Sequence, residues 1–358
     1  MRVLGASDKV VPVWVCLILL LSLVGLRAAA DQQWDVIPAN GVVDGGSGVW
    51  DVTTPNWTAN GGGTDGVWTS GNAIFGTSPT SPRNVNIVST GVDATAVTFN
   101  AAYNLSGGTL NLIGSNPTIN GSSTISSRIT SAATVTLNSG SLSLLGTVST
   151  GLSGTTSLIV NGAAVSLASS QPAGSLGDMV INSGSLALSG SSLVGLGDIT
   201  VNAGGTLLLN GANPAMGAGK TIRLNGSSLS VSSAAQLGSY NIFLGTNGTL
   251  NTAGTFTTTS NITLGTDNIT FAAAAGTQTL AGAVTATLSG SVNILNKTGS
   301  GTLVLGGGAT DTTPNSFNPQ SLLYLQDQVW REMRREQGGI SRWTAWARRR
   351  FQLRKEKS

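Results

Sequence analysis

The chain has 358 residues and a net charge of +3, with only 9% charged residues, 49 glycines, one cysteine and no histidine. An average soluble domain is about 25% charged and about 7% glycine, so this composition excludes an ordinary cytosolic enzyme, and the missing histidine excludes a histidine-based triad and imidazole metal ligands. The positive charge belongs to the two ends, because residues 31–319 hold ten aspartates, no glutamate and five basic residues, which argues against nucleic-acid binding by the main body.

Residues 1–30 have the pattern of a secretory signal peptide. Arg2 and Lys9 form a basic start, an apolar run follows over Val10–Leu26, and Ala28–Ala30 supplies small residues before a cleavage site. The alternative is a transmembrane anchor, which needs roughly 20 apolar residues, and this run is shorter and interrupted. Cleavage removes the single cysteine, so the mature protein has no disulfides. We expect a secreted protein, extracellular or on the surface of a bacterium.

A tryptophan-rich region, residues 31–95, follows the signal. Its four tryptophans are Trp34, Trp50, Trp57 and Trp68, and the next tryptophan in the chain is Trp330. We interpret them as a cap over the first coil of a repetitive fold, because an open end would expose apolar surface and unpaired backbone. The alternative is a carbohydrate-stacking platform formed by Trp50, Trp57 and Trp68.

Residues 96–313 contain near-copies of one phrase, in which alternating apolar and polar residues lead to a corner with asparagine and glycine. The asparagines recur at spacings of 23, 21, 20 and 23 residues, at Asn138, Asn161, Asn182, Asn202 and Asn225. A fixed period of this size is the signature of a solenoid. Period-2 alternation gives each short strand an inner and an outer face, and glycine and asparagine tolerate the corner geometry.

The pattern predicts an all-β fold, a parallel right-handed β-helix with 20–23 residues per coil and roughly ten coils. Stacked asparagines would form a structural ladder of side-chain hydrogen bonds. An antiparallel meander is the alternative, because Asn-Gly between apolar runs is also a hairpin signal. We favour the solenoid, since a meander gains nothing from identical residues at equivalent positions.

Asp178 and Asp198 occupy matching Leu-Gly-Asp positions in adjacent copies. One interpretation is a weak Ca²⁺ site with oxygen ligands, and the other is a pair of turn-forming aspartates at exposed corners. Glycoside chemistry with paired carboxylates would also need two aspartates brought together, and these two are the candidates. We favour the turn interpretation and expect no catalytic residue, no metal site and no cofactor.

The tail, residues 314–358, differs in composition from everything before it. Leu322, Leu325, Val329 and Met333 recur as on one helix face, and a basic run follows. Three interpretations remain open. The tail is a shifted reading frame, an amphipathic helix that caps the fold, or a basic amphipathic segment for an anionic membrane surface.

Three segments resemble proteins with autotransporter-associated β-strand repeats, which are passenger-type proteins. Trp50–Gly76 (WDVTTPNWTANGGGTDGVWTSGNAIFG) is similar to their tryptophan-rich opening, Ala96–Gly114 to the first coil, and Asn296–Gly308 (NKTGSGTLVLGGG) to the repeat motif itself. The resemblance implies a β-helical passenger associated with the bacterial outer membrane or cell surface.

Together these patterns predict a secreted or cell-surface structural and adhesive β-solenoid without catalysis. Its partners would be surface polysaccharide or other surface proteins, with no nucleic acid, and with membrane contact only through the signal segment or the basic tail. Two alternatives stay open: a polysaccharide-binding or polysaccharide-degrading β-helix protein, and a non-functional fragment of a longer passenger.

Overall fold

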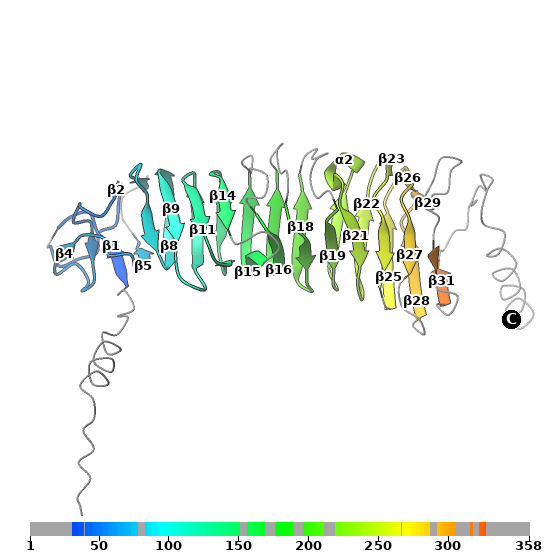
Figure 1. Cartoon of the computed structure of the whole chain (residues 1–358), viewed down its shortest axis with the longest axis horizontal. Coiled ribbons are helices and arrows are strands. Elements are labelled where there is room, and N and C mark those ends of the chain that lie inside the picture. Colours follow the sequence, from blue (N-terminus) through cyan, green and yellow to red (C-terminus); the bar gives the residue numbers. More distant parts are fainter. Residues whose placement is uncertain are drawn as a thin grey trace, which may run out of the picture.

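The computed structural model shows a nearly all-β rod, a β-solenoid of about nine turns (Figure 1). It describes residues 31–38, 40–77, 83–150, 156–168, 176–189, 196–210, 219–265, 267–286, 292–305, 316–317 and 322–326. The predicted signal peptide and most of the tail lie outside these residues. Among the described residues no helix is long and apolar enough to span a membrane.

The first end of the rod is a small cap built around aromatic rings. Its strands are β1 (Gln32–Trp34), β2 (Gly48–Trp50), β3 (Trp57–Thr58) and β4 (Asp65–Gly66). Strand β3 is antiparallel to both β1 and β4, whereas β1 and β2 pair in parallel with strands of the first coil. The antiparallel strands therefore belong to the cap and the parallel ones begin the solenoid.

The first face of the solenoid is a ladder of parallel strands. Its members are β5 (Asn72–Phe75), the first half of β8 (Ala96–Gly107), the first half of β10 (Thr118–Ile125), β12 (Val135–Leu137), the first halves of β15 (Thr156–Leu167) and β16 (Asp178–Leu188), β17 (Ile199–Val201), β19 (Thr221–Leu224), β21 (Asn241–Leu244), β24 (Ile262–Leu264), β27 (Val284–Ala286) and β30 (Ser316–Phe317).

The second face continues from the first around a corner. It contains β6 (Asn84–Ile87), the second halves of β8, β10, β15 and β16, and then β13 (Ser141–Leu144), β18 (Gly205–Leu209), β20 (Ser228–Val231), β22 (Thr249–Thr252), β25 (Asp267–Ala273), β28 (Val292–Thr298) and β31 (Leu322–Gln326).

The third face is built in two separate stretches. The first is β7 (Val92–Ala94), β9 (Thr109–Leu112), β11 (Arg128–Ser131) and β14 (Val148–Thr150), and the second is β23 (Phe256–Thr258), β26 (Thr277–Leu280) and β29 (Thr302–Leu305). A four-residue helix, α2 (Ala234–Leu237), follows β20 and precedes the second stretch.

The strand register fixes the length of each coil. From β12 to β27, paired residues on the first face are separated by 23, 21, 20, 23, 20, 20 and 22 positions, through the column Val135, Leu158, Met179, Ile199, Ile222, Ile242, Ile262 and Val284. All of these pairs are parallel, so the solenoid interpretation is confirmed and the meander is wrong for this part. The right-handed sense of the coil stays a prediction.

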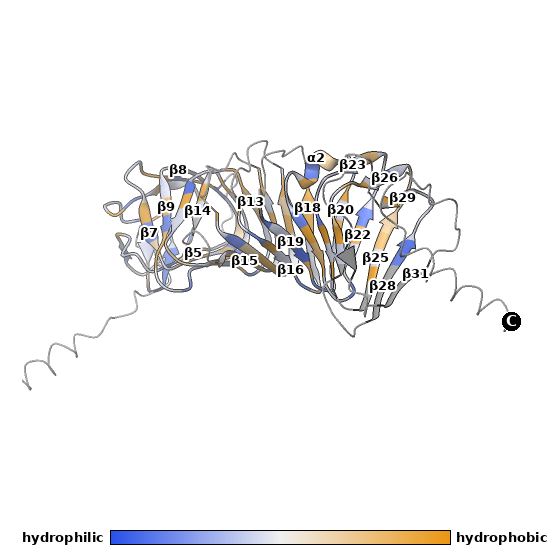
Figure 2. Cartoon of the chain, turned by 45° about the vertical axis from the view of Figure 1, so that its right-hand side comes forward, coloured by the Kyte–Doolittle hydropathy of each residue, from blue (hydrophilic) through white to orange (hydrophobic). Residues whose placement is uncertain are grey.

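The core is a set of inward-facing apolar columns. One column, buried at every level, consists of Leu137, Val160, Ile181, Val201, Leu224, Leu244 and Leu264. Hydrophobic and hydrophilic residues are mixed along the strands (Figure 2), as expected where only one side of each strand faces the core. Each inward residue lies between its equivalents in the coils above and below, and similar residues in successive copies favour the close packing of a protein interior.

Two details differ from the sequence prediction. Short strands were expected, but β15 has 12 residues and β16 has 11, because the chain passes the asparagine corner with shifts of register and continues as strand. The other difference is at Leu322–Gln326, where a helix face was expected. These residues form β31, paired in parallel with β28, because the exposed edge of the last coil is a template for another strand.

Candidate binding surface

The outward side of the second face carries a block of uncharged residues over seven consecutive coils. Two outward residues of each of these coils lie in register from coil to coil. We call this set the uncharged face, and it consists of Ser141, Ser143, Ala164, Ser166, Ser185, Ala187, Thr206, Leu208, Ser228, Ser230, Thr249, Asn251, Thr270 and Ala272. Parallel strands lie about 4.8 Å apart, so hydroxyl and methyl groups recur along the rod at that spacing.

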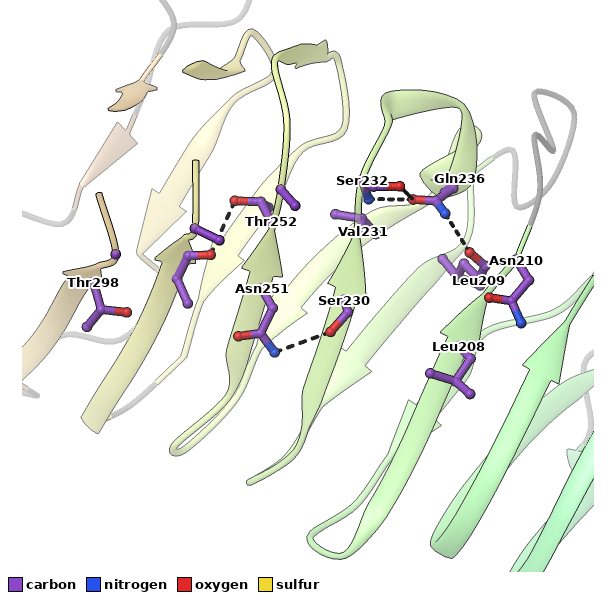
Figure 3. Close-up of a pocket in the computed structure, with 14 residues that line it drawn as sticks. Leu208, Leu209, Asn210, Ser230, Val231, Ser232, Gln236, Asn251, Thr252 and Thr298 are labelled. Atoms are coloured by element: carbon purple, nitrogen blue, oxygen red, sulfur yellow. Dashed lines mark hydrogen bonds between the residues drawn. The ribbon is translucent and has the colours of Figure 1, made fainter. Parts of the chain in front are cut away.

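A groove of about 500 Å³ crosses this face beside α2 (Figure 3). Its floor is made of small residues such as Ala253, Ala272 and Ala274, and Leu208 contributes an exposed apolar side chain. On the α2 side, Gln236 donates to the carbonyl of Leu209 (2.8 Å) and accepts from the backbone of Ser232. These bonds hold the wall of the groove in place.

Two of the polar side chains that line the groove contact each other. Asn251 Nδ2 lies 3.4 Å from Ser230 Oγ, and the two side chains belong to neighbouring strands β22 and β20 (Figure 3). Among the residues that the structure describes, no acidic or basic side chain lines the groove. The site can therefore exchange hydrogen bonds with a neutral partner and offers no ion pair to a charged one.

The asparagine column runs along the corner between the first and second faces. Asn182 Nδ2 donates to Asn161 Oδ1 (2.8 Å), Asn202 donates to Asn182 (2.8 Å), and Asn225 donates to Asn202 (3.2 Å). Asn138 makes the same bond to Asn120 (2.9 Å), a residue that sequence spacing did not single out, and this pair is a separate stretch because Asn138 and Asn161 are not bonded to each other in the described structure. These bonds tie successive coils together at the corner.

We expect replacement of Asn182 by alanine to weaken the solenoid. Asn182 both donates to Asn161 and accepts from Asn202, and each hydrogen bond contributes about 0.5–1.5 kcal/mol. The free energy of unfolding in urea should fall by roughly 1–2 kcal/mol. Asn251→Ala is the control, because its one bond to Ser230 is long, and a loss as large as that of Asn182→Ala would contradict the ladder's role.

Asp178 and Asp198 lie in adjacent coils, and one carboxylate oxygen of each accepts a hydrogen bond from the backbone. Asp178 Oδ1 accepts from the amide of Asp198 (2.9 Å), and Asp198 Oδ1 accepts from the amide of Thr221 (2.8 Å). Among the described residues there is no group of three acidic, cysteine or histidine side chains that could hold a metal ion. This geometry favours the turn interpretation, in which each aspartate secures the start of the next coil.

Tyr240 is fully buried near this pair, and its hydroxyl donates to the carbonyl of Gly197 (2.8 Å). Burial, together with the nearby carboxylates of Asp198 and Asp178, raises the pKa of Tyr240 well above its ordinary value of 10.0. The hydroxyl therefore stays protonated and remains a donor at neutral and moderately alkaline pH.

This raised pKa predicts a stability loss at alkaline pH. The unfolded tyrosine ionises near pH 10.0 and the folded one does not, so the contribution of Tyr240 is fully present below pH 10 and declines as the pH rises above it. Tyr240→Phe should lose about 1–3 kcal/mol at pH 7, because a buried carbonyl loses its donor, and should show a shallower decline above pH 10. Urea unfolding of both proteins across this range measures the difference, and parallel declines would contradict the assignment.

The four early tryptophans form one buried cluster. Trp34, Trp50, Trp57 and Trp68 are at most 2% exposed, and Trp57 lies 5.1, 5.1 and 4.4 Å from the other three, centroid to centroid. A sugar can stack only on an exposed ring face. The geometry thus agrees with a cap and offers no platform at Trp50, Trp57 or Trp68.

The groove was not predicted from the sequence, although the sequence does contain a signal for the helical turn that forms one wall of the groove. Ser233 and Gln236 have the Ser-x-x-Gln spacing of a capping box, and Gln236 Oε1 does accept from the amide of Ser233 (3.1 Å). This spacing could have indicated a helical turn inside the repeats. Comparison of the chain with protein-family models, curated proteins and solved structures found no match.

Proposed function

We propose that this protein is a secreted or cell-surface structural and adhesive module of the autotransporter passenger type, which binds neutral polysaccharide and performs no catalysis. The single observation that supports this most strongly is the uncharged face, where seven coils align fourteen outward residues without one charge. Hydroxyl and amide groups must lose bound water before they can form hydrogen bonds with a sugar's hydroxyl groups. This loss costs less free energy for a neutral group than for a charged one.

A rod suits a polymeric ligand because equivalent groups repeat along it. A glycan that lies along the face meets the same kind of side chain at each coil, and weak contacts then add through multivalency. The groove beside α2 gives one place on this face where a chain can be partly enclosed.

The proposal is tested by pull-down of the mature chain with insoluble neutral glycans (cellulose, chitin and a β-1,3-glucan) and with anionic polymers (alginate and pectate), each at low and high salt. We expect retention on at least one neutral glycan, unchanged by salt, because no ion pair is involved. Retention on the anionic polymers alone, lost in high salt, would overturn the proposal.

A carbohydrate-active enzyme on the same scaffold is the second candidate, favoured by the position of Asp178 and Asp198 in adjacent coils. Assay of reducing ends released from the same polymers separates the two functions. Turnover that disappears in Asp178→Asn would establish the enzyme, and we expect no turnover by the wild-type protein.

A further inference from the structure

We propose that a second groove, on the third face next to the cap, binds a neutral saccharide through a pair of adjacent hydroxyl groups. This groove has a volume of about 470 Å³, within the ~300–1,000 Å³ typical of small-molecule sites. Its floor comes from strands β7, β9 and β11, and one wall comes from Val52 and Ser70 of the cap region. It lies on a different face from the groove beside α2.

Three polar side chains in successive coils form an ordered row on the groove floor. Asn111 Nδ2 donates to Asp93 Oδ1 (2.8 Å), and Thr130 Oγ1 donates to Asn111 Oδ1 (3.0 Å). Asp93 is exposed, and Oδ2 of its carboxylate has no hydrogen-bond partner within the described part of the chain. Asn111 keeps a second amide hydrogen, so a free acceptor and a free donor stand side by side.

A vicinal diol fits this arrangement of groups. One hydroxyl can donate to Asp93 Oδ2 while its neighbour accepts from the remaining Asn111 amide hydrogen, since each hydroxyl is both donor and acceptor. Val52, 55% exposed, gives the wall an apolar patch for the C–H side of a sugar ring. An anionic ligand would be repelled by Asp93, and one carboxylate with one amide is too small a ligand set for Ca²⁺, which takes 6–8 oxygens.

The cap holds this row in position before any ligand arrives. Trp68, itself buried, donates from Nε1 to the backbone carbonyl of Asp93 (2.6 Å), and the next residue, Thr69, is bonded to Gln32 in β1. Groups fixed in this way lose little conformational freedom on binding. Trp68 is thus a positioning residue for the saccharide site rather than a stacking surface.

The test is a two-dimensional NMR titration of the mature protein with methyl α-mannoside, methyl β-galactoside and cellobiose. We expect at least one of them to shift the side-chain amide signals of Asn111 with saturation in the millimolar range. Asp93→Asn and Asn111→Ala should each weaken this binding about tenfold or more. Asn104→Ala is the matched control, because Asn104 donates to Asn84 (2.9 Å) in an exposed pair on the second face, and it should bind as the wild type does.

Three results would overturn the inference: no shift with any of the three sugars, an equal loss in Asn104→Ala, or a shift with CaCl₂ in place of the sugars. The site does not depend on the proposed function of the uncharged face. A Ser166→Glu/Ala187→Glu variant, altered only on that face, should keep sugar binding at Asn111, so failure of either proposal is recognisable without the other.

Discussion

Replacement of Trp57 by alanine should cost about 3–5 kcal/mol, the range observed for deletion of a buried large aromatic side chain. The ring is 1% exposed and packs against three other indoles and Phe75. In a solenoid each coil is stabilised mainly by its neighbours, so the loss should appear first at the cap. Hydrogen exchange, read for amides of β1–β5 and of β19–β22 separately, measures the effect.

Trp57→Phe is the matched control for this variant. The indole Nε1 of Trp57 is buried without a hydrogen-bond partner in the described structure, so phenylalanine keeps an aromatic ring and gives up no hydrogen bond. It should cost clearly less than alanine. Trp57→Ala could instead leave the protection of the cap amides unchanged and reduce the affinity for sugar. That result would contradict the cap interpretation and support the alternative, in which Trp57 stacks on a sugar.

Replacement of Gly184 by alanine should also destabilise the solenoid strongly. Gly184 has φ of +80°, and a Cβ atom there would lie 2.3 Å from the carbonyl oxygen of Ala163 in the previous coil. The left-handed conformation alone costs roughly 1–2 kcal/mol for alanine, and a clash with backbone adds about 1–3 kcal/mol.

Gly219→Ala separates these two costs. Gly219 has φ of +71°, and no atom lies within 4 Å of the position of its Cβ, so only the conformational cost remains. Urea unfolding of both variants measures the difference, which should be at least about 1 kcal/mol. Equal stabilities would mean that the coils do not approach each other this closely at the corner.

The periodicity of the sequence was enough to predict the solenoid, because each repeat in the sequence corresponds to one coil of the stack. The recurring asparagines give the coil length, and Asn161, Asn182 and Asn202 are bonded to one another at those spacings. Alternation likewise predicted which residues face inward, since Leu137, Val160 and Ile181 occupy one buried column.

Sequence patterns could not predict the features that depend on contacts between different parts of the fold. Asp93 and Asn111 carry no motif, and their pairing arises because β7 and β9 are in register on the third face. The burial of all four tryptophans follows from folding of the cap over the first coil. The strand at Leu322–Gln326 has the apolar spacing of a helix, and the edge of β28 determines its conformation.

The central claim is that the uncharged face is the adhesive surface, and a Ser166→Glu/Ala187→Glu variant tests it most directly. These residues are in register on adjacent coils of that face, so the change stacks two negative charges there. The matched control is Val180→Glu/Thr200→Glu, because these residues are partly exposed and in register on the first face. Both variants carry the same repulsion between stacked charges.

The measurement is the dissociation constant of each variant for the neutral glycan that the wild type retains. We predict at least a tenfold weakening for the variant on the uncharged face and wild-type affinity for the control. Equal affinities in the two variants, whether both are weakened or both are unchanged, would contradict the assignment of binding to this face.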